Sequence, residues 1–311
     1  MALSFREVGE QWKADKRRWV KPSSYATYVN HINAHIYPFF EDIPSEELSE
    51  QTVLDFIIYL TDKGLRERSV RDMTMVLKMI LRHGAKMGAW PNFDLGVRIP
   101  RRAGVPENGV AVLSQQEQKS LLKYLSDNFS FRNLGLQLCL LTGLRIGEVC
   151  GLQWRDLDVA AGVVHVRKTV QRIWLEDGSE HEYFLHVGPP KTFTSMRDIP
   201  ICRELMRLLR PLRKVMSDDY FVVSNKPAPL EPRYLRDYFR KTLARVGIPP
   251  VRFHALRHSF ATRCIESRCD YKTVSAILGH SSSSTTLDRY VHPGYREMKQ
   301  AIDRMSRSLG V

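Results

Sequence analysis

The chain has 311 residues, 43% of them hydrophobic, and a mean hydropathy of −0.31, which is typical of a globular protein with room for two domains. No apolar run approaches the roughly 20 residues of a membrane span, and the N-terminus lacks the apolar segment of a secretory signal. We therefore expect a cytoplasmic protein without membrane contact. The formal net charge is +13, and residues 101–311 carry most of it, with 33 basic against 21 acidic side chains, which indicates a polyanionic partner such as nucleic acid.

Residues 3–89 carry apolar side chains at three- and four-residue steps, so the pattern predicts helices only. Ser49 is the expected N-cap of the third helix, and Gly64 is its expected end. Four helices with short connections predict a compact bundle over residues 1–89. They are expected at 5–18, at 23–40, between Ser49 and Gly64, and at 69–87.

Residues 90–112 interrupt the helical pattern with several prolines and glycines beside Arg101 and Arg102, which predicts an extended basic linker and a domain boundary. Residues 113–311 are predicted to form a second domain that is mainly α with a small antiparallel β-sheet. Ser114 and Glu117 form a capping box at its first helix. Helices are expected at 114–127, 131–142, 145–153, 202–216, 231–246, 254–268, 270–278 and 295–308, and strands at 163–166, 170–175, 183–187 and close to Ile199-Pro200.

The five cysteines give no sign of a metal centre or a disulfide framework. They are odd in number and form no C-x-x-C pair. Those that fall in apolar helical pattern (Cys139, Cys150 and Cys264) are expected to be buried small hydrophobic residues. We expect neither a metal nor a cofactor.

The segment Thr142-Gly143-Leu144-Arg145-Ile146-Gly147-Glu148 places an arginine directly after an apolar helix. The glycines permit a close backbone turn, and Glu148 is suited to brace the guanidinium of Arg145. A buried structural Arg–Glu pair explains this segment equally well by itself. Further along, His254 and Arg257 are three residues apart on a predicted helix and project from one face. An arginine fork matches phosphate oxygens, and a histidine moves protons, although a helix start produces the same pattern.

Three further side chains are candidates for the same chemistry. His280 follows Gly279, the expected left-handed cap of its helix, and is either a ligand contact or a capping histidine. Tyr290 is a candidate nucleophile whose phenol, with a pKa of about 10, needs cations close by; packing is the alternative role, and Tyr295 competes with it. Lys191 is expected at a hairpin tip beside the sheet, where it is either a general acid or an ordinary surface lysine.

Taken in order, these segments resemble the tyrosine recombinases, the phage- and transposon-type integrases. The resemblance runs through Thr-Gly-Leu-Arg-x-Gly-Glu, Pro-Lys-Thr…Ser…Arg-x-Ile-Pro, His-x-x-Arg-His, Leu-Gly-His and Thr-Thr-Leu-x-x-Tyr-x-His, at residues 142–148, 190–200, 254–258, 278–280 and 285–292. It covers the whole second domain. The first domain is similar in pattern only, because the core-binding domain of that family is also a small helical bundle joined by a linker.

The resemblance implies a site-specific DNA recombinase or integrase of a mobile genetic element. It implies cleavage and rejoining of DNA strands through a 3′-phosphotyrosine, with no metal or nucleotide cofactor. Arg145 and Arg257 would hold the scissile phosphate, Tyr290 would attack it, and Lys191 would protonate the departing 5′ oxygen. His254 would act in acid–base transfer and His280 as a hydrogen-bond donor.

The same resemblance implies a clamp around double-stranded DNA and a homotetramer in the synaptic complex, with accessory DNA-bending or directionality proteins as further partners. No arm-binding domain is expected before residue 3. The apolar stripe of the helix at 295–308 either docks on a neighbouring protomer or packs on its own domain. Two other functions remain open: a type IB topoisomerase-like relaxase, and a catalytically silent DNA-binding protein.

Overall fold

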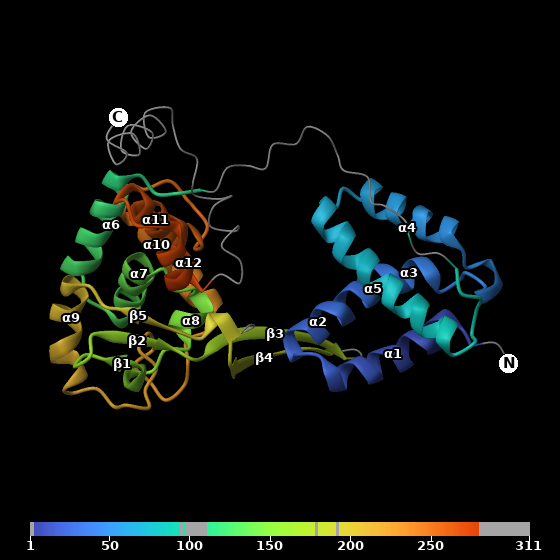
Figure 1. The fold of residues 1–311 in the computed structure, drawn as a ribbon, viewed down its shortest axis with the longest axis horizontal. Helices are drawn as coiled ribbons and strands as arrows, with labels where there is room; N and C mark the ends of the chain where they lie inside the picture. The colour runs from blue at the N-terminus through green and yellow to red at the C-terminus, as the bar shows by residue number, and fades with distance from the viewer. Residues whose placement is uncertain (1–2, 94–95, 97–110, 178–179, 191–192, 280–311) are drawn as a thin grey trace, which may run out of the picture. The chain divides into compact units, whose positions relative to one another are not determined.

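A computed structural model describes residues 3–93, 96, 111–177, 180–190 and 193–279. The chain divides into two compact units, one built mainly from residues up to 107 and the other from most of the remainder, and each is treated separately (Figure 1). The described residues are mainly helical with small antiparallel sheets, which confirms the predicted fold class. The linker predicted at 90–112 and the helix predicted at 295–308 fall largely or wholly outside the described residues and stay predictions.

The N-terminal unit contains the predicted helices around one aromatic core. Ser49 caps its helix and accepts a hydrogen bond from the backbone N–H of Thr52, as predicted. The helix predicted at 23–40 is interrupted by a π-helical turn at Ile32–Ile36. Phe40 and Phe56 lie fully buried with their ring centroids 5.3 Å apart. The helices are α1 (Phe5–Trp19), α2 (Pro22–His31), α3 (Tyr37–Phe40), α4 (Glu50–Asp62) and α5 (Glu67–Lys86).

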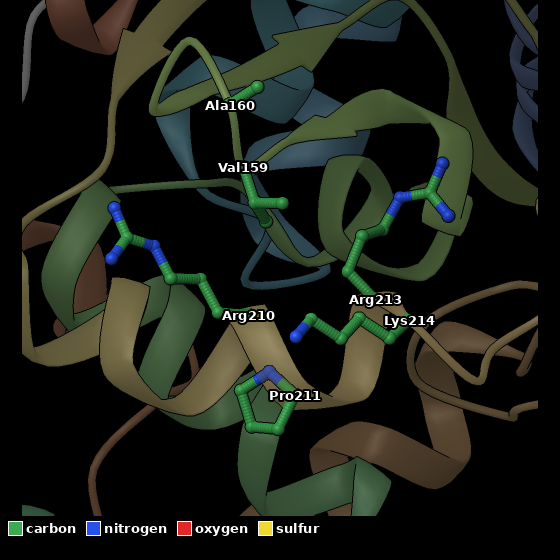
Figure 2. Close-up of a pocket in the computed structure, with 6 residues that line it drawn as sticks. All are labelled: Val159, Ala160, Arg210, Pro211, Arg213 and Lys214. Atoms are coloured by element: carbon green, nitrogen blue, oxygen red, sulfur yellow. The ribbon is translucent and has the colours of Figure 1, made fainter.

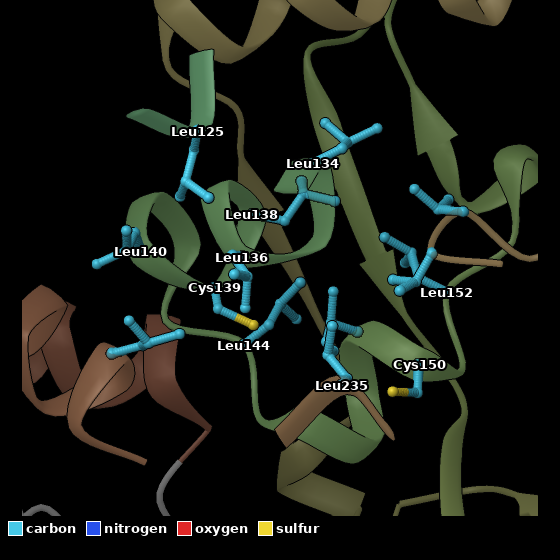
Figure 3. Packing of buried hydrophobic residues seen from close by; sticks show 14 of the residues in the cluster. Leu125, Leu134, Leu136, Leu138, Cys139, Leu140, Leu144, Cys150, Leu152 and Leu235 are labelled. Carbon is cyan, nitrogen blue, oxygen red and sulfur yellow. The ribbon is translucent and has the colours of Figure 1, made fainter. Parts of the chain in front are cut away.

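The second unit is built around α7 (Phe131–Thr142), which has buried residues on all sides. It packs against α11 and lies between that helix and a three-stranded sheet (Figure 1). Figure 3 shows Leu136 and Leu138 of this helix in one buried cluster with residues of other segments, among them Leu125, Leu144 and Leu235. The capping box of Ser114 and Glu117 is present as predicted. The other helices are α6 (Gln115–Asp127), α8 (Ile146–Cys150), α9 (Arg203–Arg213), α10 (Pro232–Val246), α11 (Ala255–Glu266) and α12 (Tyr271–Leu278).

The cysteines predicted to be buried behave as small core residues in two cases. Cys139 and Cys150 are fully buried, whereas Cys264 is only half-buried. Burial raises the pKa of the Cys150 thiol to about 12 and that of Cys264 to about 11. These thiols therefore stay protonated and unreactive at neutral pH.

The described strands form two separate groups, which the sequence pattern did not distinguish. The antiparallel order β1-β2-β5 places Val164 opposite Ile199 and Val166 opposite Arg197, and among the described strands β3 pairs with β4 alone. β4 and β5 belong to different sheets, and Lys191, which follows β4 in the sequence, lies outside the described residues, so the hairpin tip expected there stays a prediction. The strands are β1 (Leu157–Asp158), β2 (Val163–Val166), β3 (Thr169–Asp177), β4 (Glu180–Gly188) and β5 (Arg197–Pro200).

Candidate active site

Gly143 ends α7 and begins the short loop that presents Arg145. Its backbone is left-handed, with φ of 69°. A Cβ atom at this position would lie 2.7 Å from Cδ1 of Phe260 and 2.8 Å from Cδ2 of Leu278, so the packing leaves no room for a side chain. Arg145 follows as the N-cap of α8, and its side chain is 35% exposed. The turn therefore delivers a guanidinium that solvent, or a ligand, can reach.

A comparison of two glycines tests this account. Gly143→Ala is expected to lower the free energy of unfolding by about 2–4 kcal/mol, because left-handed strain adds to the clash with Phe260 and Leu278. Gly247 caps α10 with φ of 73° and has open space around its Cβ position, so Gly247→Ala is expected to cost only about 1 kcal/mol. Urea unfolding of both variants measures the difference, and equal losses would show that packing around residue 143 is not limiting.

The predicted brace between Arg145 and Glu148 is confirmed. Nη1 of Arg145 donates to Oε1 of Glu148 at 2.7 Å, and the backbone N–H of Arg145 donates to Oε2 at 2.9 Å. The Glu148 side chain is only 2% exposed. The carboxylate therefore fixes both the backbone and the side chain of Arg145.

Glu148 has a second partner, Arg197, to which the sequence analysis gave no role. Nη1 and Nη2 of Arg197 donate to the two carboxylate oxygens of Glu148 at 3.0 and 2.9 Å. Arg197 lies on β5 and is buried on the same side as Ile199. An arginine two residues from a buried isoleucine on a strand shares its face, and this alternation was the signal that could have found it. A buried arginine needs an anion, and Glu148 supplies it.

Arg257 lies two residues inside α11 and is 2% exposed. Its Nη1 donates to the carbonyl oxygen of Gly143 at 2.8 Å, and its Nη2 donates to that of Leu278 at 2.6 Å. These bonds join three segments that are distant in the sequence. Arg257 is therefore held at the place where the loop before Arg145 meets the end of α12.

Three guanidinium groups converge on the end of α12. The carbonyl oxygens of residues 277–279 accept hydrogen bonds from Arg197 at 2.5 Å, Arg257 at 2.6 Å and Arg145 at 3.3 Å respectively. The final carbonyl groups of a helix have no partners within it and carry the negative end of its dipole. The arginines satisfy these groups. The structure thus brings together Arg145 and Arg257, two of the predicted site residues.

The electrostatics of Glu148 follow from this geometry. Burial alone would raise the pKa of its carboxyl, but the hydrogen bonds and charge of Arg197, with the charge of Arg145, outweigh burial and lower the pKa to about 2. Because the folded pKa is depressed, the stabilisation is complete above the unfolded pKa near 4.5 and is lost as the pH falls through about 2. Its size is on the order of 3 kcal/mol.

Acid therefore provides a second test. Glu148→Gln is expected to lower the free energy of unfolding at pH 7 by about 3–5 kcal/mol, because it leaves Arg197 buried without an anion. The difference in the free energy of unfolding between this variant and wild type is expected to shrink between pH 5 and pH 2, where the wild-type carboxylate loses its own contribution. Hydrogen exchange of peptides covering α7 and α8 measures this difference locally. A difference that stays constant over this pH range would contradict the assigned pKa.

His254 lies directly before α11 as its N-cap residue, with helical backbone angles, and its side chain is exposed. Its ring contacts the ring of His258 edge to face, with centroids 4.5 Å apart. His258 is buried. His254 and Arg257 therefore occupy the same end of α11, and only the histidine is exposed there.

Lys191, His280 and Tyr290, like the competing Tyr295, lie outside the described residues. Their described neighbours in the sequence nevertheless meet. A Cβ atom on Gly279 would lie 3.1 Å from the backbone oxygen of Thr194 and 2.9 Å from Cδ of Arg197. Thr194, three residues after Lys191, therefore contacts Gly279, which directly precedes His280.

A surface hollow of about 500 Å³ lies elsewhere in the second unit, between α9 and the turn after β1 (Figure 2). Arg210, Arg213 and Lys214 line it, and Arg213 pairs with Asp218 at 2.6 Å. None of the candidate site residues contributes to this hollow. It is a basic surface separate from the arginine cluster.

Two findings bear on other classes of site. Within the described ranges, no group of three or more His, Cys, Asp or Glu side chains is arranged to hold a metal ion. Of the helices that the structure describes, none is long and apolar enough to span a membrane.

The chain belongs to the phage integrase family, whose family model matches residues 111–297. A second model, the N-terminal SAM-like domain of phage integrases, matches residues 4–61. Among curated relatives, the ICEBs1 integrase of Bacillus subtilis (strain 168) is 26% identical over 92% of this chain and 78% of its own length. The tyrosine recombinase XerA of Pyrococcus furiosus is 26% identical over 90% of this chain and 92% of its own length. The chain is accordingly a tyrosine-type site-specific DNA recombinase.

Solved structures share the fold. The Tn1549 transposon integrase, in complex with a circular intermediate DNA, matches 95% of this chain and 98% of its own with a TM-score of 0.73 and 20% identity. A lambda integrase tetramer bound to a Holliday junction matches 94% of this chain and 80% of its own with a TM-score of 0.63 and 17% identity. At these identities the likeness establishes the architecture, which agrees with the predicted one.

Proposed function

We propose that the arginine cluster at the end of α12 binds the scissile phosphate of double-stranded DNA and that Tyr290 attacks it. The Oη atom of Tyr290 forms a bond to phosphorus, and the bond from phosphorus to the 5′ oxygen breaks, which leaves a 3′-phosphotyrosine. The 5′ hydroxyl of a partner strand then attacks the phosphotyrosine, which forms a new phosphodiester bond and releases Tyr290. The phosphotyrosine keeps the energy of the broken bond, so the exchange needs no nucleotide.

The proton-transferring groups are assigned in the same proposal. Lys191 protonates the departing 5′ oxygen, His254 takes part in acid–base transfer, and His280 donates a hydrogen bond to the phosphate. Arg145 and Arg257 stabilise the charge that develops on the non-bridging oxygens, which is the largest single contribution in reactions of this type. Guanidinium forks suit these oxygens because they donate two parallel hydrogen bonds.

One observation carries the proposal: Arg145 and Arg257 converge on the same helix end from different segments of the chain. Arg145 is partly exposed there, so a phosphate can approach it. The chain on either side of this point leads directly to Lys191 and His280, since Thr194 and Gly279 are in contact. A structural role alone requires none of these segments to meet at an accessible guanidinium.

The wider arrangement is part of the proposal. Residues 1–89 bind the DNA core site, 90–112 link the two domains, and 113–311 carry the chemistry on one duplex. The complexes of the Tn1549 and lambda integrases with DNA support a DNA substrate, and the lambda integrase tetramer on a Holliday junction supports a tetrameric synapse. The ICEBs1 integrase supports a mobile element as the substrate. A DNA substrate also supports the expected cytoplasmic location. Accessory DNA-bending or directionality proteins complete the proposed set of partners.

Trapping on nicked DNA tests the function. The full chain is incubated with a pool of nicked duplexes made from the genomic DNA that encodes it, so that cleavage next to a nick releases a short strand and prevents religation. A covalent protein–DNA adduct is the expected product. The enriched duplex then serves as the defined substrate for all further measurements.

The same substrate separates the two rival functions. Absence of any adduct would support a catalytically silent DNA-binding protein. Relaxation of a supercoiled plasmid that carries a single copy of the site, without exchange between two sites, would support a type IB topoisomerase-like relaxase. Strand exchange between two labelled duplexes supports the recombinase.

A further inference from the structure

Every nitrogen atom of the Arg197 guanidinium donates a hydrogen bond. Besides the two hydrogen bonds to Glu148, its Nε donates to the carbonyl oxygen of Ile277 at 2.5 Å and its Nη1 to that of Ser195 at 2.9 Å. Its side chain is 6% exposed. The fork of Arg197 is paired with both oxygens of Glu148, whereas Arg145 is 35% exposed and shares only one of them through its side chain, so the roles of the two arginines differ.

The charges of the cluster indicate what that role is. Glu148 carries one negative charge and contacts two guanidinium groups, those of Arg145 and Arg197. With Glu148 alone, the partly exposed Arg145 would belong to a neutral pair and would attract an anion weakly. Arg197 supplies the second positive charge, so that Glu148 fixes the geometry of Arg145 without cancelling its charge.

Arg197 also holds the end of α12, to which the side chain of Arg145 is hydrogen-bonded. The Nη2 atom of Arg145 reaches the carbonyl oxygen of Gly279, while Arg197 holds the carbonyl oxygen of Ile277 two residues earlier. Gly279 has a left-handed backbone, and a Cβ atom there would lie 2.9 Å from Cδ of Arg197. Arg197 and the end of α12 are therefore packed so closely that the position of each depends on the other.

We propose that Arg197 is a positioning residue of the recombination reaction, acting through Glu148 and the end of α12 to orient Arg145 and preserve its charge. This inference rests on the proposed function of Arg145 as a phosphate ligand. It assigns to Arg197 an effect on the rate of strand cleavage at saturating DNA rather than on DNA affinity, since the fork of its guanidinium is paired with Glu148.

Arg197→Met and Arg197→Lys test the proposal on the trapped nicked duplex. Arg197→Met is expected to slow single-turnover cleavage by about 10–100-fold, the usual range for groups that orient a reacting side chain. Its dissociation constant for DNA is expected to stay within about threefold of wild type, because the phosphate contacts that set affinity are unchanged. Arg197→Lys keeps the charge but loses the paired donors of the guanidinium, and its cleavage rate is expected to lie between those of wild type and Arg197→Met.

A matched control removes a different arginine from the same unit. Arg213 pairs with Asp218 and takes part in none of the cluster's hydrogen bonds described above, and Arg213→Met is expected to leave cleavage within about threefold of wild type, as expected of an isolated surface ion pair. If Arg197→Met does not fold, the cleavage rate of Arg197→Lys provides the same test. The double variant Glu148→Gln/Arg197→Met, which leaves no unpaired buried charge, provides a second test. If Arg197 acts through Glu148, adding Arg197→Met to Glu148→Gln costs less than it does in wild type.

Three outcomes would overturn the inference. The first is cleavage by folded Arg197→Met and Arg197→Lys within about threefold of wild type. The second is a loss that appears only as weaker DNA binding. The third is full additivity of the two substitutions in the double variant. Failure of the proposed function is recognised separately, because wild type itself would then form no covalent adduct on the pool of nicked duplexes, and the inference would fall with it.

Discussion

Arg145→Ala is expected to slow strand cleavage by about 10²–10³-fold, because it removes a preorganised donor from the oxygens on which charge develops in the transition state. Arg145→Lys is expected to recover only part of this loss, since an ammonium group is a point charge and cannot form paired hydrogen bonds to phosphate. The measurement is the single-turnover rate at saturating nicked duplex.

Arg207→Ala is the matched control for charge. Arg207 is exposed on α9 and takes part in none of the cluster's hydrogen bonds described above. Its replacement by alanine removes the same single positive charge as Arg145→Ala. It is expected to alter DNA affinity and its salt dependence slightly, with the cleavage rate unchanged. Equal effects of the two substitutions on cleavage would mean that Arg145 contributes only to the general attraction of DNA, and its role as a phosphate ligand would be wrong.

Tyr290→Phe is expected to abolish the covalent adduct, with cleavage below about a thousandth of the wild-type rate, because no other group replaces a missing nucleophile. DNA binding is expected to persist, since the cations that neutralise phosphates are intact. Denaturing gels detect the adduct, and a binding assay at two salt concentrations measures affinity.

Tyr295→Phe accompanies it as the control, because the two phenols lie in the same short segment of the sequence. This variant is expected to form the adduct at close to the wild-type rate. An adduct that survives Tyr290→Phe and disappears in Tyr295→Phe would transfer the nucleophile to Tyr295.

Local signals in the sequence predicted most of the helices well. The capping boxes at Ser49 and Ser114 fix helix starts through hydrogen bonds between residues three apart, so a short window contains all the information. Gly143 and Gly279 were likewise recognisable as helix ends, because left-handed backbone favours glycine. Such features depend on neighbouring residues alone.

Features that depend on distant residues were harder to predict. The separation of β3 and β4 from the three-stranded sheet is decided by which strand edges meet, and alternation within one strand does not specify its partner. The role of Arg197 required knowing that β5 lies against both Glu148 and the end of α12. Motif order selected Arg145 and Arg257 as candidate site residues, but their shared attachment to one helix end appears only in three dimensions.

The central claim is that Arg145 and Arg257 hold the phosphate that Tyr290 attacks. A structure of the full chain covalently trapped on its nicked duplex, determined by cryo-electron microscopy or crystallography, measures this directly. The account predicts the phosphorus bonded to Oη of Tyr290 with both guanidinium groups within hydrogen-bond distance of its non-bridging oxygens. A phosphate bonded to another residue, with these two guanidinium groups contacting only backbone carbonyl oxygens and Glu148, would contradict it.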